Sequence, residues 1–224
     1  MTGDLHLLAW SAWLALCSAA VLAVPAVGVG YWLAQPGART PRVVVEAACT
    51  LPLVLPPTAV GLLLLELLAA GTPVGRALER LGVELVFTPG GVVLAGAVMG
   101  LPLWVRSARS AFEGVDVRLV AVARTLGRTR LGAFRDVELP LAARGITAGG
   151  LLAFCRALGE FGATILLAGN IPGRTQTVPL AIFQRAQAGD DAGALRLVGL
   201  VTGVAFAVVL SHELLLRRGG RARA

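Results

Sequence analysis

Leu7–Leu33 reads LLAWSAWLALCSAAVLAVPAVGVGYWL, an apolar stretch without a charged residue. A hydrocarbon core about 30 Å thick is crossed by about 20 helical residues, each of which rises about 1.5 Å. The stretch is therefore long enough to span a membrane. Because lipid offers the backbone no hydrogen-bond partners, a spanning segment must satisfy its own polar groups, and a helix does so within one segment. We expect a membrane-spanning helix here.

Four more apolar stretches follow in the 224-residue chain, at Val43–Ala70, Val86–Val105, Ile146–Ala168 and Leu197–Leu216. Together they predict an all-α integral membrane protein with about five spanning helices, in a single domain over residues 1–224. The second stretch contains LPLVLPP at Leu51–Pro57. Since prolines remove backbone donors, we expect a kink or an unwound turn there. Only 15% of residues are charged, against about 25% in soluble domains.

The first stretch has an alternative interpretation as a cleaved signal peptide, because small residues such as Ala23 and Ala26 follow its apolar run. A signal peptide begins with a basic region and has a short apolar core. Here the residues before Leu7 include Asp4 but no Lys or Arg, and the apolar run is too long. A retained helix is the favoured interpretation.

The basic residues predict the orientation. All 20 are arginine, and 14 of them lie between spans one and two, between spans three and four, or after span five. A five-span topology places these segments on one side, and basic segments stay in the cytoplasm. We therefore expect a multi-pass inner-membrane protein with its N-terminus outside and its C-terminus inside. The net charge of +7 thus reflects membrane insertion, and no aromatic or zinc module accompanies it to indicate nucleic-acid binding.

Catalytic motifs are absent from the sequence. Without lysine, the chain cannot form the phosphate-binding P-loop of an ATPase. It also has no H-E-x-x-H or G-x-S-x-G motif, which zinc proteases and serine hydrolases need. Cys17, Cys49 and Cys155 lack metal-ligand spacing. We expect no catalytic residue, cofactor or metal, and any ATPase must be a separate chain.

The segment Arg106–Arg144 is longer than a connection between antiparallel helices requires. Its apolar residues recur at helical spacing, first at Val115, Leu119, Val122 and Leu126, then at Leu131, Phe134 and Val137. Gly127 separates the two groups, and Leu139-Pro140 closes the second. We expect two short helices joined at a glycine. They either lie on lipid headgroups as interfacial helices or dock a soluble partner.

AVARTLG at Ala121–Gly127, followed after nine residues by VELP at Val137–Pro140, resembles the cytoplasmic E-A-A signature of ABC importer permeases. Ala121 stands where the family has Glu. The resemblance implies a type I, MetI-like bundle with a coupling helix that inserts into a cleft of the ATP-binding subunit. The residues to which it assigns this role are Arg118, Ala123, Gly127, Phe134, Leu139 and Pro140.

RALGEFGAT at Arg156–Thr164 and GNIPGRTQT at Gly169–Thr177 resemble the molybdate permeases of this family, as do Leu51–Pro57 and Phe112–Asp116. Sulfate/thiosulfate and tungstate permeases share the Gly-Glu-Phe/Tyr-Gly element, so these anions remain alternatives. The resemblance implies a homodimer of permeases with two ATP-binding subunits and an extracytoplasmic protein that delivers the oxyanion. It also implies alternating access driven by ATP.

Arg156 and Glu160 lie one helical turn apart in the fourth span. An unpaired charge at the bilayer centre costs at least ~2.5–3.5 kcal/mol, so a structural pair is favoured over direct contact with the anion. Thr164 and Asn170 are further candidates for the pathway. A stand-alone secondary transporter would show repeated halves or several intramembrane ionisable groups, and an anchoring protein would have no use for a long cytoplasmic loop.

Overall fold

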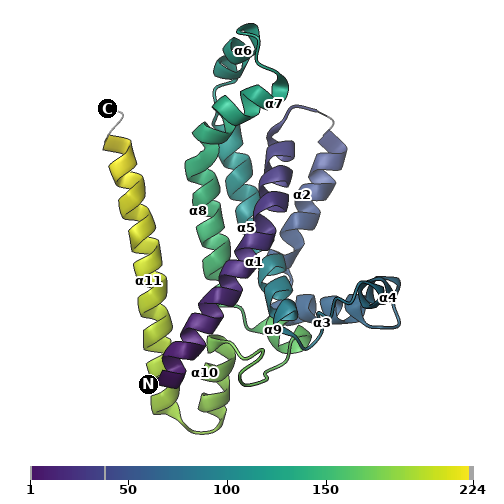
Figure 1. Cartoon of the computed structure of the whole chain (residues 1–224), viewed down its shortest axis with the longest axis vertical. Coiled ribbons are helices and arrows are strands. Elements are labelled where there is room, and N and C mark those ends of the chain that lie inside the picture. Colours follow the sequence, from purple (N-terminus) through teal and green to yellow (C-terminus); the bar gives the residue numbers. More distant parts are fainter. Residues whose placement is uncertain (1, 38, 222–224) are drawn as a thin grey trace.

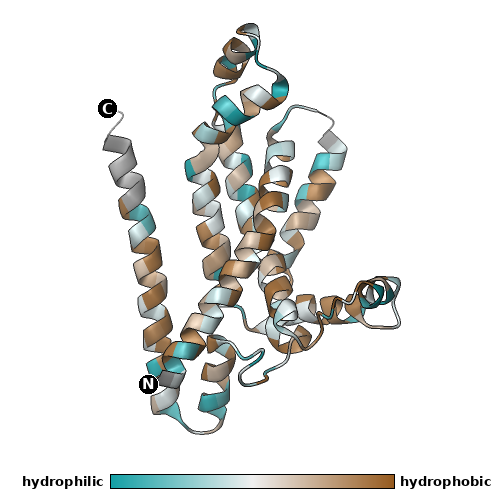
Figure 2. Cartoon of the chain, viewed as in Figure 1, coloured by the Kyte–Doolittle hydropathy of each residue, from teal (hydrophilic) through white to brown (hydrophobic). Residues whose placement is uncertain are grey.

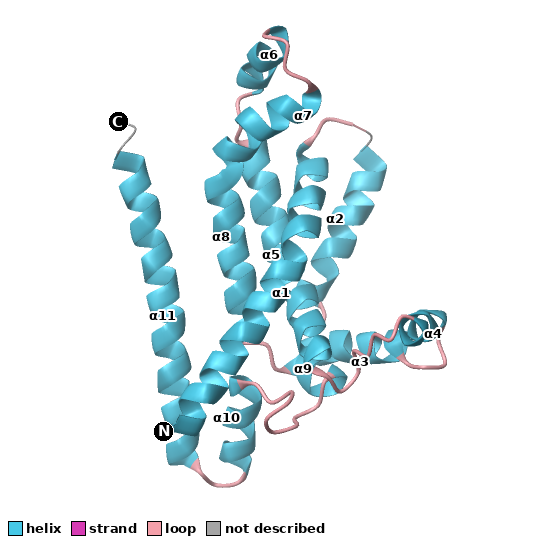
Figure 3. Ribbon diagram, in the orientation of Figure 1, coloured by secondary structure: helices cyan, strands magenta, loops and turns pink. Residues whose placement is uncertain are grey.

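The computed structural model describes residues 2–37 and 39–221, and this part of the chain consists of helices and loops without a strand (Figure 3). The α-helices are α1 Thr2–Ala34, α2 Arg39–Val54, α3 Pro57–Leu68, α4 Pro73–Arg80, α5 Pro89–Glu113, α6 Val117–Thr125, α7 Arg130–Ala133, α8 Leu139–Leu158, α9 Gly162–Leu167, α10 Val178–Gln187 and α11 Asp191–Arg221. A π-helical turn, η1, covers Phe134–Glu138 between α7 and α8.

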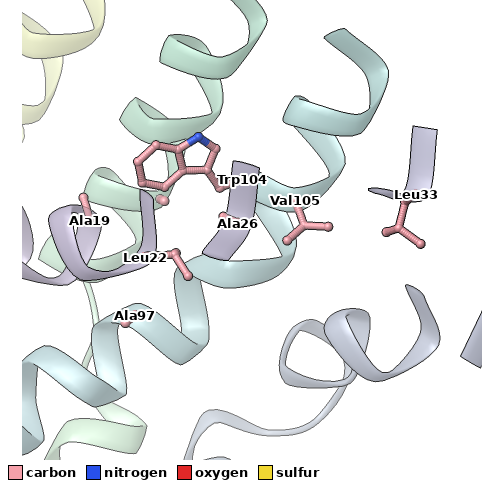
Figure 4. Packing of buried hydrophobic residues seen from close by; sticks show 8 residues of the cluster. Ala19, Leu22, Ala26, Leu33, Ala97, Trp104 and Val105 are labelled. Atoms are coloured by element: carbon pink, nitrogen blue, oxygen red, sulfur yellow. The ribbon is translucent and has the colours of Figure 1, made fainter. Parts of the chain in front are cut away.

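The centre of the molecule is formed by α1, α5 and α8, which pack against one another along much of their lengths (Figure 1). Small residues allow this close approach. Ala26 and Ala108 have no exposed surface, and a Cβ on Gly30 would lie only 2.7 Å from the Cβ of Ala108. Larger side chains, among them Leu22 and Trp104, fill the space beside these contacts (Figure 4).

The proline-rich stretch Leu51–Pro57 interrupts its helix, as expected from the sequence. The interruption is a turn of 115° between α2 and α3, so the second apolar stretch is two helices and not one kinked rod. Pro57 begins α3, where a missing N–H costs nothing. The turn places α3 on α9, where a Cβ on Gly61 would be 2.7 Å from Ala163 Cα.

The secondary structure of the segment Arg106–Arg144 differs in part from the two short helices that were expected. Helix α5 continues to Glu113, while Arg130–Leu158 is a single helical segment long and apolar enough to span a membrane. The expected second short helix is the beginning of this long one, and Pro140 does not close it. The π-helical turn explains the continuity. A proline clashes with the carbonyl four residues earlier, whereas here the wider turn connects the Leu139 N–H to the Phe134 carbonyl, five residues back.

The fourth apolar stretch is also divided, since α8 ends at Leu158 and the short helix α9 begins at Gly162. In residues 2–37 and 39–221, four helices are long and apolar enough to cross a membrane, and the bent pair α2–α3 raises this number to five if it counts as one span. Most of α2 and α11 is apolar, and hydrophilic residues gather near α4, α6 and α7 (Figure 2). These findings confirm the prediction of an all-α membrane protein with about five spans.

The ends of the helices gather at two ends of the molecule (Figure 1). Helices α6 and α7, the turn between α1 and α2, and the C-terminal end of α11 lie at one of them, the α6 end. The start of α1 lies with α4, α9 and α10 at the other, the α10 end.

Candidate functional site

Helix α6 has defined signals at both ends. The carboxylate of Asp116 accepts a hydrogen bond from the Arg118 N–H at 2.8 Å and caps the first turn. At the other end Gly127 adopts a φ of 88°. The Arg128 N–H then bonds to the Ala123 carbonyl and the Gly127 N–H to the Arg124 carbonyl, each at 3.1 Å. This pair of bonds is a Schellman motif, which depends on a left-handed residue such as glycine.

The surface of α6 and the turn after it is unusually apolar. We call its exposed large side chains the α6 patch: Val117, Leu119, Val122, Leu126 and Leu131. Leu126 is 79% exposed and Leu131 65% exposed. Arginines 118 and 124 are exposed beside them. Several exposed apolar side chains in so short a segment are typical of a surface that meets a protein or a membrane.

The residues predicted for coupling divide into two groups. Arg118 and Gly127 lie at the exposed tip, and Ala123 is buried on the inner side of α6. Phe134 and Leu139 are half-buried against a core formed by α5 and α8 residues, and Pro140 lies exposed in the continuous helix. Phe134 therefore belongs to the base of this region and not to its exposed tip.

The base contains a polar contact that sequence reasoning missed. Tyr31, near the end of α1, donates a hydrogen bond from its hydroxyl to Glu138 Oε2 at 3.1 Å. The Tyr31 ring also meets Phe112 and Phe134 edge-on, with centroids 5.0 and 4.7 Å apart. The available signal was that Tyr31 is the only tyrosine in the chain, placed at the end of an apolar span.

Arg156 and Glu160 form the ion pair that their spacing predicted, with Arg156 Nη1 at 2.6 Å from Glu160 Oε2. The Glu160 side chain is only 2% exposed. Its other oxygen, Oε1, accepts a hydrogen bond from the Ala163 N–H at 2.7 Å. The carboxylate thus joins the end of α8 to the first turn of α9, and both of its oxygens have partners.

The other two predicted pathway residues lie in different surroundings. Thr164 is 1% exposed within α9. Asn170 lies in the loop after α9. Its side-chain Nδ2 donates a hydrogen bond to Gln184 Oε1 at 3.2 Å, and its Oδ1 accepts one from Gln176 Nε2 at 3.1 Å. Within residues 2–37 and 39–221, no group of three or more His, Cys, Asp or Glu could hold a metal ion.

Residues 8–218 match the model of the family described as binding-protein-dependent transport system inner membrane component. The chain belongs to this family. Its members are the inner-membrane subunits of ABC importers, so an ATPase resides on a separate chain of the complex.

Relatives of this permease include the molybdenum transport system permease protein ModB of Escherichia coli (strain K12), which is 44% identical over 80% of this chain and 81% of its own length. The putative molybdenum transport system permease protein YvgM of Bacillus subtilis (strain 168) is 37% identical over 74% of this chain and 73% of its own. The sulfate transport system permease protein CysT of Salmonella typhimurium is 34% identical over 80% of this chain and 65% of its own.

Solved structures support the fold independently of sequence. A chain of the inward-facing MetNI methionine ABC transporter superposes with a TM-score of 0.69 and covers 97% of this chain and 94% of that one, at 14% identity. A chain of an amino acid ABC transporter gives a TM-score of 0.57. At such low identity these likenesses speak for the fold alone, and they confirm the expected MetI-like permease bundle.

Proposed function

We propose that this chain is the permease of an ATP-driven importer that carries molybdate across the inner membrane. The observation that carries the proposal is the 44% identity, over 80% of the chain, to a permease named for molybdenum transport. Tungstate, an oxyanion of the same shape and charge, is expected to pass nearly as well. The 34% identity to a sulfate permease keeps sulfate as the second candidate.

The pairing of Arg156 is compatible with an anionic substrate. A permease replaces the lost hydration of a dianion with hydrogen-bond donors and helix N-termini, and tight binding would trap the ion. Because Glu160 already neutralises Arg156 at 2.6 Å, this arginine is not a free cation that would hold the anion. Selectivity is then a property of the extracytoplasmic binding protein that delivers the oxyanion.

The α6 patch is the proposed docking site for the ATP-binding subunit. Its five apolar side chains are exposed: Val117, Leu119 and Val122 on α6, Leu126 just after it and Leu131 in α7. The main packing contacts of α6 are with η1 and α7. A soluble subunit that covers the patch would remove this apolar surface from water, which is favourable by about 25 cal/mol per Å². Two permeases and two ATP-binding subunits would complete the complex, and lipid would surround its spans.

We further propose that the α6 end faces the cytoplasm. Of the 20 arginines, 14 fall in segments that lead to this end, although Arg223 lies outside the described residues. Arg76, Arg80, Arg174 and Arg185 belong to segments at the α10 end. The excess of positive charge favours a cytoplasmic α6 end and an external N-terminus.

Cysteine labelling tests this orientation. In a chain whose three natural cysteines are replaced, Leu81→Cys and Leu126→Cys provide sites that are 75% and 79% exposed in the parent. We expect a membrane-impermeant maleimide to label Leu81→Cys in intact cells, because the α10 end faces outward. Leu126→Cys should react only in inside-out vesicles from cells that lack the ATP-binding subunit. Labelling of Leu126→Cys but not of Leu81→Cys in intact cells would show that the α6 end faces outward and would contradict the proposed orientation.

Uptake into proteoliposomes with the complete complex tests the substrate. We expect molybdate uptake to be blocked by excess tungstate and to exceed sulfate uptake by about tenfold, which corresponds to about 1.4 kcal/mol of discrimination. The control is the same complex with non-hydrolysable ATP, which should not accumulate anion. Strong sulfate uptake that molybdate does not compete with would refute the substrate, while the importer class would stand.

A further inference from the structure

The connection from α6 to the membrane helices includes packing on η1, beside the chain links from α5 to α6 and from α6 to α7. Helix α6 packs on η1 and α7, and Arg128, just after Gly127, forms an ion pair with Asp136 of η1 at 3.2 Å. A displacement of α6 by a soluble subunit can therefore act on η1 as well as on α5, to which α6 is joined by residues 114–116. The turn lies where Pro140 prevents ordinary helical bonding, and π-helical turns are frequent at functional sites.

From η1 two side chains reach α1 and α5. Phe134 begins the turn and contacts Tyr31 edge-on, and Glu138 ends it and accepts a hydrogen bond from the Tyr31 hydroxyl. Phe112 completes the group, with its ring 5.0 Å from that of Tyr31. We call Tyr31, Phe112, Phe134 and Glu138 the η1 joint. A hydrogen bond to a charged acceptor is directional, so it fixes η1 on α1 more tightly than ring contacts alone.

Helix α1 is held with equal specificity at its other end. Asp4 pairs with Arg185 of α10 at 2.5 Å, and Ser11 Oγ accepts the Val178 N–H at 2.9 Å. From residue 4 to residue 31 a helix extends about 40 Å at 1.5 Å per residue. One continuous element therefore connects the η1 joint with α10 and the outer loop before it.

We propose that the η1 joint passes movement of α6 to α1, and that Tyr31 is its positioning residue. The proposal rests on the importer function, since it requires that a soluble subunit moves α6. When α6 shifts, η1 turns with it, and the Tyr31–Glu138 hydrogen bond makes α1 follow. Without this bond α6 still docks and ATP is still hydrolysed, but α1 follows less faithfully and fewer anions cross for each ATP consumed.

Tyr31→Phe tests the joint because it removes one hydroxyl and keeps the ring that contacts Phe112 and Phe134. In proteoliposomes with the whole complex, we expect the number of ATP molecules hydrolysed per anion transported to rise about tenfold, as expected for loss of one hydrogen bond to a charged acceptor. Glu138→Gln keeps an accepting oxygen but loses the charge, so its ratio should lie between those of the parent and Tyr31→Phe. Glu138→Leu should raise the ratio of ATP hydrolysed to anion transported as much as Tyr31→Phe does. The double variant with Tyr31→Phe and Glu138→Leu should raise this ratio no further than either single variant. The matched control is Ser211→Ala, which removes a hydroxyl bonded within α11.

An unchanged ratio in Tyr31→Phe, or additive effects in the double variant, would overturn the proposal. Failure of Tyr31→Phe to assemble would also overturn it, because the hydroxyl would then serve folding.

Hydrogen exchange gives a readout that needs no transported anion. Nucleotide should alter exchange at both 134–139 and 27–33 in the parent, but only at 134–139 in Tyr31→Phe. If the parent shows this exchange response but transports none of the three oxyanions, the assigned substrate fails and the joint stands.

Discussion

Gly127→Val is expected to abolish ATP-driven uptake while the permease still inserts into the membrane. Gly127 has a φ of 88°, and a β-branched residue in such a conformation costs about 1–3 kcal/mol. Apart from its chain neighbours, no atom lies within 4 Å of a Cβ placed there, so the effect would come from backbone strain and not from a clash. The Schellman bonds that end α6 depend on this conformation, and their loss would misplace the α6 patch.

Two control variants separate this effect from a general loss of stability. Gly189→Val introduces the same kind of strain, since Gly189 has a φ of 79° and open space around it, but it lies between α10 and α11. It should leave co-purification of the ATP-binding subunit intact. Gly127→Asn should retain most activity, because Asn tolerates the left-handed region better than other residues. Normal uptake by Gly127→Val at parental expression would refute the docking role of α6.

Glu160→Leu is expected to give the largest loss of folded permease. The substitution removes the partner of Arg156 and the acceptor of the Ala163 N–H. Breaking a buried pair on one side costs about 3–5 kcal/mol, and a buried N–H without an acceptor costs about 1–3 kcal/mol more. The measurement is the temperature at which the detergent-solubilised chain loses its monodisperse peak, together with its yield in membranes.

The chain contains a matched control for this variant. Arg109 and Glu113 have the same spacing, at 2.7 Å, but the Glu113 side chain is 47% exposed and Arg109 also pairs with Glu46 at 2.6 Å. Glu113→Leu should cost at most about 1 kcal/mol, as is usual for exposed pairs. Equal losses in the two variants would show that burial of Glu160 is not decisive.

Arg156→Gln should impair assembly or gating more than it alters the preference between molybdate and sulfate.

Some features of the site could be predicted because they depend on neighbours along the chain. The spacing of Arg156 and Glu160 puts them one turn apart in any helix, and their pair is present. Gly127 was identified as a helix end because a left-handed residue is a local requirement, and its φ is 88°. Tyr31 and Glu138 are 107 residues apart, and no local pattern indicated their contact.

The sequence by itself determined the membrane class and the approximate number of spans, because lipid forces apolar backbone into helices whatever the neighbours are. Tertiary structure decided what the prolines do. At Pro56-Pro57 the chain turns by 115°, and α3 packs closely on α9. At Pro140 the helix instead continues through a π-helical turn. A proline removes the same donor in both places, and the packing around it selects between a break and a wider turn. Tertiary packing also places Phe134 against Tyr31, away from the exposed tip.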